Sequence, residues 1–108
     1  MPYKVYHSAR FNKELSKFDS SFQKQIDKIE DNLTENPFVG NSLNVKWFRE
    51  KRVGVYRIYY LIYEDLQSVF MIAISGKKDQ QKVIDTIKLI TTFLREEIEN
   101  LIKKGDFI

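Results

Sequence analysis

The stretch KWFREKRVGVYRIYYLIY, residues 46–63, predicts a β-hairpin. Both of its arms are rich in aromatic and β-branched residues, which favour strands, and Gly54 lies between them with the conformational freedom of a tight turn. If Gly54 and Val55 form a two-residue loop, Arg52 pairs with Arg57 directly across the hairpin. We therefore expect strands at residues 47–52 and 56–63, with two arginines side by side on one face of the sheet.

The surplus positive charge of the protein lies in this hairpin. Residues 46–57 hold five basic residues and one acid, a net charge of +4, whereas the whole chain of 108 residues carries +3. The basic residues are Lys46, Arg49, Lys51, Arg52 and Arg57, and the acid is Glu50. Cations beside aromatic rings suit a phosphate backbone with unpaired bases. The alternative is a charged strand that only protects a sheet edge from pairing.

The rest of the chain predicts helices and strands around the hairpin. Residues 3–7 alternate as a strand, and apolar spacings of three and four then indicate two helices that end before Pro37. A third hairpin-linked strand follows at residues 68–75 and a long helix at residues 80–104. The order β-α-α-β-β-β-α predicts a single α+β domain over residues 1–108, with a helical hairpin on a small antiparallel sheet.

Alternation along the second hairpin strand assigns its two faces. Tyr56, Ile58, Tyr60 and Ile62 share the face that should pack on the N-terminal helices. Arg52, Arg57 and Tyr59 would then lie on an open face, and the turn after the third strand would bring Lys77 and Lys78 beside them. An anion such as phosphate would relieve the repulsion among these cations. A register slip of one residue would move Arg52 to the other face.

The composition excludes several kinds of site. There is no cysteine, so disulfides, thiolate zinc sites and cysteine nucleophiles are absent, and one histidine cannot build a histidine metal site. No apolar run approaches the roughly 20 residues of a membrane span. We expect a cytoplasmic protein with no metal, no cofactor and no membrane partner.

Several segments resemble the RelE/ParE superfamily of toxins from bacterial and archaeal toxin–antitoxin modules. FNKELSKF and FQKQIDKIEDNLTENPFVG resemble the helical hairpin of that family, and REKRVGVYRIYYLIYEDL resembles its central β-hairpin. VFMIAISGKKD is similar to its last strand and the basic turn that follows. The resemblance covers residues 3–82 and is closest to archaeal members.

The resemblance implies a RelE-like toxin: a metal-independent endoribonuclease that cuts mRNA on the ribosome and is neutralised by a cognate antitoxin. It carries Arg57 over as the residue that stabilises the transition state, with Arg52 and Lys78 as its catalytic partners. The remaining residues expected to bind RNA are Lys46, Arg49, Lys51, Lys77 and Tyr59.

Two departures from the family pattern leave the chemistry open. Active relatives often place a tyrosine soon after the basic turn, whereas residues 80–84 read QQKVI. Glu50 stands seven residues before Arg57, where a basic residue is common, so the general base and acid are not assigned. The alternatives are a ParE-like inhibitor of DNA gyrase without nuclease activity and an inactive relative that binds another protein.

The C-terminal helix is longer than the family pattern. About 25 helical residues would span ~37 Å, more than the width of a domain of this size. Residues 92–108 are the extended part of this helix, and the apolar stripe within residues 92–104 therefore needs a partner. The stripe consists of Leu94, Ile98, Leu101 and Ile102. It bends back over the open face, pairs with a second copy in a homodimer, or receives the antitoxin.

Overall fold

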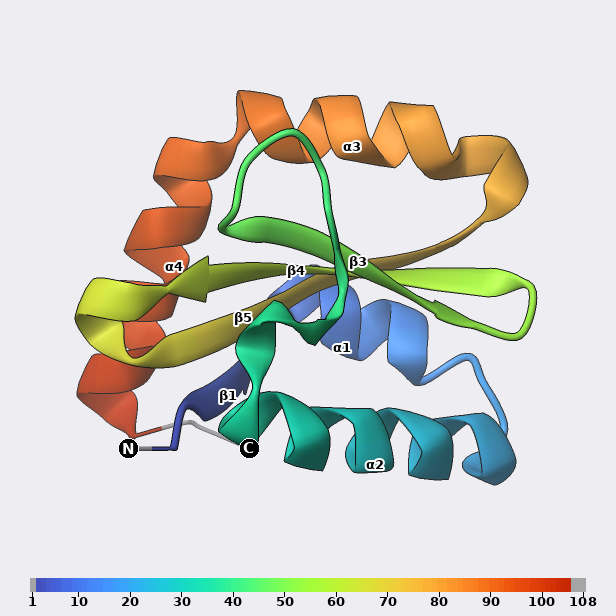
Figure 1. Ribbon diagram of the computed structural model, residues 1–108, viewed down its shortest axis with the longest axis horizontal. Coiled ribbons are helices and arrows are strands. Elements are labelled where there is room, and N and C mark those ends of the chain that lie inside the picture. Colours follow the sequence, from blue (N-terminus) through green and yellow to red (C-terminus); the bar gives the residue numbers. More distant parts are fainter. Residues whose placement is uncertain (1, 106–108) are drawn as a thin grey trace.

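The computed structural model describes residues 2–105, and its centre is a five-stranded sheet in the order β1-β5-β4-β3-β2 (Figure 1). The strands are β1 (Lys4–His7), β2 (Asn41–Ser42), β3 (Phe48–Val53), β4 (Tyr56–Tyr63) and β5 (Ser68–Gly76). The helices are α1 (Ala9–Leu15), α2 (Ser20–Glu35), α3 (Gln80–Leu89) and α4 (Thr91–Lys104). Short 3₁₀ turns occupy Pro37–Val39, Glu64–Leu66 and Lys77–Asp79. The expected α+β class is confirmed.

The sheet differs from the expected one at its two edges. β1 joins β5 in parallel, with Lys4 beside Ser68, because the helical hairpin and the meander together form the long crossover that parallel pairing needs. The segment between Pro37 and β3, for which no strand is expected, contributes β2, in which Asn41 pairs with Glu50. The antiparallel meander of β3, β4 and β5 is as predicted.

Helices cover both faces of the sheet (Figure 1). α1 and α2 cover one face, where Ile26 and Leu33 are buried together with Ile58 and Tyr60 of β4. This confirms the face that alternation assigned to the N-terminal helices. The short break between the two helices is stabilised by Asp19, whose side chain accepts a hydrogen bond from the Phe22 amide at the start of α2.

The C-terminal segment is helical as expected and has a long C-terminal helix, but it is divided into two helices rather than continuous over residues 80–104. α3 ends at Leu89, and after Ile90 α4 runs in a different direction down the sheet (Figure 1). Leu94 and Ile98 of α4 are buried against the sheet with Val83 and Ile87 of α3. The face expected to be open is therefore covered, and the alternative in which the tail bends back over it is confirmed.

Candidate phosphate-binding groove

The β3–β4 hairpin has the predicted register. Val53 pairs with Tyr56 and Arg52 with Arg57, and Gly54 in the turn has a φ of +60°, the left-handed conformation that glycine adopts without strain. Directly paired residues project on the same side of a sheet, so both arginines leave the sheet on the face that carries α3. The adjacent Arg57–Ser75 pair of β4 and β5 brings the turn after β5 to the same end of the sheet.

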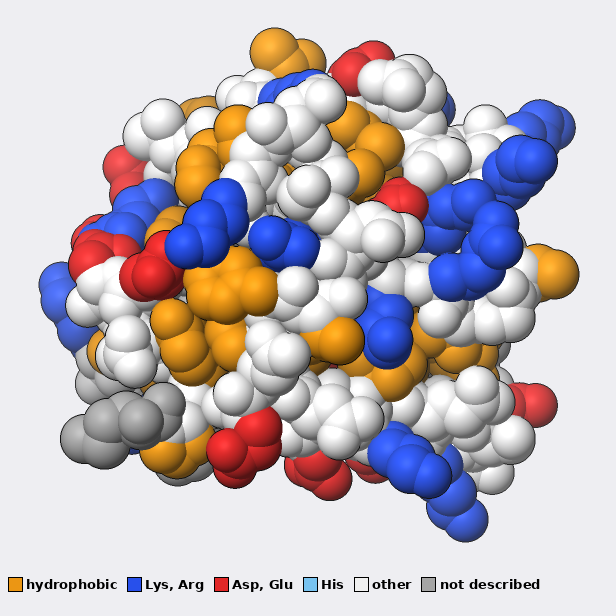
Figure 2. All heavy atoms as spheres, viewed as in Figure 1, with side chains coloured by type: hydrophobic (Ala, Val, Ile, Leu, Met, Phe, Trp, Pro, Cys, Tyr) orange, Lys and Arg blue, Asp and Glu red, His pale blue; other side chains and the backbone are white. Residues whose placement is uncertain are grey.

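The three cations Arg52, Arg57 and Lys77 border one shallow groove. The groove has a volume of about 370 Å³, and its remaining lining residues are Gly54 and Val55 of the turn. Lys and Arg side chains gather at this end of the molecule, at the right of Figure 2. Within residues 2–105, neither Arg52 nor Lys77 forms an ion pair, so both charges are available to an anion. Lys78 lies in the same 3₁₀ turn and is exposed, but it does not line the groove.

A carboxylate and an amide hold Arg57 at the base of this groove. Arg57 Nε lies 3.5 Å from Glu50 Oε2, and both side chains are about nine-tenths buried. Gln80 Nε2, from the first turn of α3, donates to both oxygens of Glu50 at 2.7 and 3.1 Å. Glu50 is thus engaged on both oxygens and orients Arg57 in the groove.

The sequence alone does not identify Gln80 as a member of this cluster. The sequence showed it only as a position without the family's tyrosine. Its position at the start of a helix, directly after a basic turn, is the one sign in the sequence that Gln80 could belong to the site. Its partner Glu50 lies 30 residues away in sequence.

The expectation that Tyr59 lies on an open face is wrong. Its side chain is fully buried beneath α3, and its hydroxyl shares a 2.8 Å hydrogen bond with Ser75 Oγ. Burial raises the pKa of the Tyr59 hydroxyl, against the opposing effect of that hydrogen bond. The ring could reach a base only if α3 moved away.

The remaining cations of the hairpin lie elsewhere. Arg49 and Lys51 project on the opposite face of β3 from Arg52, as alternation requires. Arg49 donates from Nη1 to the carbonyls of Phe38 and Gly40, at 3.0 and 2.6 Å, and from Nε to the carbonyl of Lys46 at 2.9 Å. Lys46 lies 3.8 Å from a carboxylate oxygen of Glu64. Among the predicted cations, Arg52, Arg57 and Lys77 therefore line the groove, whereas Arg49 holds the loop before β3 against the sheet.

The groove is suited to holding a phosphate rather than to moving protons. Guanidinium groups bind phosphate oxygens in a fork, and an ammonium adds a third point of attachment. Neither histidine nor tyrosine is among the described residues that line it. No group of three His, Cys, Asp or Glu residues that could hold a metal ion occurs in residues 2–105. Over the same residues, no helix is long and apolar enough to cross a bilayer.

Solved structures identify the fold as that of RelE toxins. A mutant of the Escherichia coli toxin RelE in the free state is 22% identical, with a TM-score of 0.68 over 79% of this chain and 93% of that one. The RelBE2 toxin–antitoxin complex of Mycobacterium tuberculosis contains a chain that is 21% identical, with a TM-score of 0.63 over 71% of this chain and all of that one. A chain of the archaeal RelE–RelB complex of Pyrococcus horikoshii is 18% identical, with a TM-score of 0.64 over 71% of this chain and 97% of that one. No protein-family model and no curated protein sequence matches the chain.

Proposed function

We propose that this protein is the toxin of a toxin–antitoxin pair and that it cuts messenger RNA on the ribosome. The observation that carries the proposal is the groove of Arg52, Arg57 and Lys77 on a sheet with the RelE fold. The solved relatives include toxins bound to antitoxins, so the expected partner is a protein encoded next to this chain.

The proposed reaction is the internal cleavage of a phosphodiester. The ribose 2′-oxygen attacks phosphorus and loses its proton, and the bond to the 5′-oxygen breaks as that oxygen gains a proton. The products are a 2′,3′-cyclic phosphate and a 5′-hydroxyl. Negative charge grows on the phosphate oxygens in the transition state, and fixed cations stabilise it there more than in the ground state.

Arg57 is the residue best placed for this role. Glu50 and Gln80 hold it before any ligand arrives, so little reorganisation accompanies the reaction. Arg52 and Lys77 attract the phosphate to the same groove. The proton acceptor and donor are then supplied by exposed Lys78, by the ribosome or by the RNA itself.

The test is expression in bacterial cells with mapping of new mRNA 5′ ends. Wild-type protein should arrest growth and produce cuts within translated codons. Arg57→Ala should reduce cleavage by roughly 10²-fold or more, the usual effect of removing one transition-state donor. Arg57→Lys keeps the charge that compensates Glu50, so its loss of cleavage would not reflect unfolding.

Lys51→Ala is the matched control for Arg52→Ala. The two residues are neighbours on β3 but project on opposite faces, so only the Arg52 change reaches the groove. Equal cleavage by the two variants would contradict the assignment of the groove. A neighbouring gene product that binds the protein and restores growth would identify the antitoxin.

A ParE-like inhibitor of DNA gyrase is the second candidate. It is favoured by the engagement of Glu50 and by the burial of Tyr59, which leave the groove without an evident acid or base. Growth arrest with DNA damage and intact mRNA would support this candidate and exclude the nuclease.

A further inference from the structure

A second groove lies at the edge of β5, around the corner from the first. β1 pairs with residues 68–71 of β5 only, so within the described chain residues 72–76 have no strand on the side away from β4. α1 and α3 flank this edge, and the groove between them has a volume of about 430 Å³. Its polar lining residues include Arg10, Glu14, Tyr56, Asp79 and Lys82.

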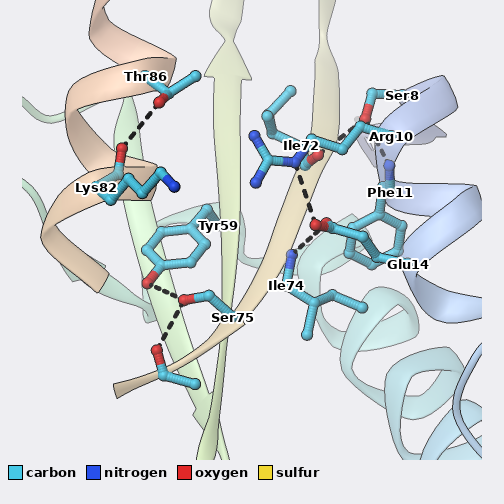
Figure 3. Close-up of polar contacts among 11 residues, drawn as sticks. Ser8, Arg10, Phe11, Glu14, Tyr59, Ile72, Ile74, Ser75, Lys82 and Thr86 are labelled. Atoms are coloured by element: carbon cyan, nitrogen blue, oxygen red, sulfur yellow. Dashed lines mark hydrogen bonds and ion pairs between the residues drawn. The ribbon is translucent and has the colours of Figure 1, made fainter. Parts of the chain in front are cut away.

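Side chains already occupy the backbone groups of this strand edge. Glu14 Oε1 accepts from the Ile74 amide at 2.9 Å, and Ser8 Oγ donates to the Ile72 carbonyl at 2.9 Å (Figure 3). A peptide that added a strand here would have to displace both contacts. The groove is therefore poorly suited to pairing with a protein strand.

Two cations enter the groove from opposite sides. Arg10 comes from α1 and Lys82 from α3, and their charged ends point toward the space between the helices (Figure 3). Arg10 uses Nε for a 3.2 Å contact with Glu14, which leaves its two terminal nitrogens without a partner in residues 2–105. The Lys82 ammonium has no partner in the same residues.

Neighbouring residues of the chain line the second groove and the first. Tyr56 lines the second groove, and its neighbour Arg57 lines the first. At the end of β5, Gly76 lines the second groove, and its neighbour Lys77 lines the first. An extended polymer that leaves the three-cation groove over the end of β5 thus meets Arg10 and Lys82. Tyr56, which is 36% exposed, adds an aromatic ring against which a base can stack.

We propose that this second groove binds the adjoining phosphate and nucleoside of single-stranded RNA, with Arg10 and Lys82 as the phosphate contacts. The inference rests on the proposed function, because it takes RNA as the ligand of the first groove. The carboxylates of Glu14 and Asp79 also border the groove and can accept hydrogen bonds. RNA presents ribose hydroxyls and base N–H donors between its phosphates, so it matches two cations beside two carboxylates better than a uniformly acidic peptide does.

The test is binding of fluorescent hexauridylate to the purified full chain, measured by anisotropy over a range of salt concentrations. The double variant R10A/K82A should bind roughly tenfold more weakly at low salt. The slope of log affinity against log salt should fall by about 0.7 for one lost phosphate contact on a single strand. K13A/K88A is the matched control, because it removes one exposed cation from each of α1 and α3 outside the groove.

The possible outcomes separate this inference from the proposed function. If R52A weakens binding while R10A/K82A equals K13A/K88A, the second groove is not part of the RNA path and only this inference fails. If the wild-type protein does not bind hexauridylate, this inference fails, whereas the proposed function fails only if no mRNA cuts appear in cells. Competition by hexaglutamate at equal affinity would overturn the choice of RNA over an acidic peptide.

Discussion

At the scale of single residues, the basic hairpin divides its side chains by face. Arg52 and Arg57 share the groove face of β3 and β4, whereas Arg49 lies on the opposite face and ties the preceding loop to the sheet. A run of positive charge therefore contains both binding and structural residues. Their roles follow from the face of the sheet on which each side chain lies, because successive side chains of a strand alternate between the two faces.

Arg49→Ala should destabilise the fold without removing a groove residue. Three carbonyl oxygens lose a charged donor, and such hydrogen bonds contribute about 1.5–3 kcal/mol each without being additive. We expect the free energy of unfolding to fall by roughly 2 kcal/mol in urea titrations. Lys51→Ala, on the same face of β3, should change it by less than about 0.5 kcal/mol. An equal effect of the two changes would mean that the loop contacts contribute nothing.

His7 forms a buried contact with Glu30. His7 Nε2 contacts Glu30 Oε2, and His7 Nδ1 lies 2.7 Å from Asn12 Oδ1. Burial by itself lowers the pKa of His7, but the hydrogen bond and the charge of Glu30, together with Asn12 and Asp27, outweigh burial and raise it. The folded state therefore holds the protonated imidazole more strongly than the unfolded state does.

The stability from this contact should depend on pH in a defined direction. It is fully present below the unfolded His pKa of about 6.5 and is lost as pH rises through the raised pKa of the folded state. Urea titrations between about pH 5.5 and 8.5 should show the unfolding free energy falling with pH in that window. Since the chain has one histidine, His7→Gln should remove this slope. A slope that persists in the variant would assign it to another group.

At the scale of elements, the decisive feature is the break between α3 and α4. Ile90, Thr91 and Thr92 are three consecutive β-branched residues, which lose side-chain freedom in a helix. The helix stops there, and Ile90 takes φ −110° and ψ 20°. The change of direction lets Leu94 and Ile98 reach the sheet, which a straight helix would have passed.

Ile98→Ala should reveal that α4 belongs to the core of this chain. Ile98 is fully buried, and removing a buried Ile side chain costs roughly 2–5 kcal/mol of unfolding free energy. Phe93→Ala on the same helix is the control, since Phe93 is 70% exposed and should contribute less than about 0.5 kcal/mol. Chemical denaturation measures both. A similar decrease in unfolding free energy for the two changes would show that α4 packs only weakly on the sheet.

At the scale of the whole molecule, the covering of both sheet faces bears on self-association. A homodimer is one of the three alternatives that the apolar stripe of the C-terminal helix leaves open in the sequence. Leu94 and Ile98 have their partners within the same chain, and the apolar residues left exposed near the corner are Leu89 and Phe93. The reason for a dimer through this stripe is therefore removed.

We expect the isolated protein to be a monomer. Size-exclusion chromatography with light scattering should give a mass near 12.9 kDa at micromolar concentration. Two exposed apolar side chains form a smaller surface than a stable interface needs, about 800 Å² per partner. A mass of twice that value, reduced to the monomer by Phe93→Glu, would instead identify the α3–α4 corner as an interface.

The sequence by itself determined the element order, the β3–β4 register and the facing of Arg52 and Arg57. These features depend on local periods, a glycine turn and adjacent strands, so nearby residues specify them. Only the tertiary structure decided the burial of Tyr59, the place of Gln80 beside Glu50 and the position of Arg10 and Lys82 on one groove. Each of these depends on how two distant elements pack, and residues far apart in the chain leave no periodic trace of their contact.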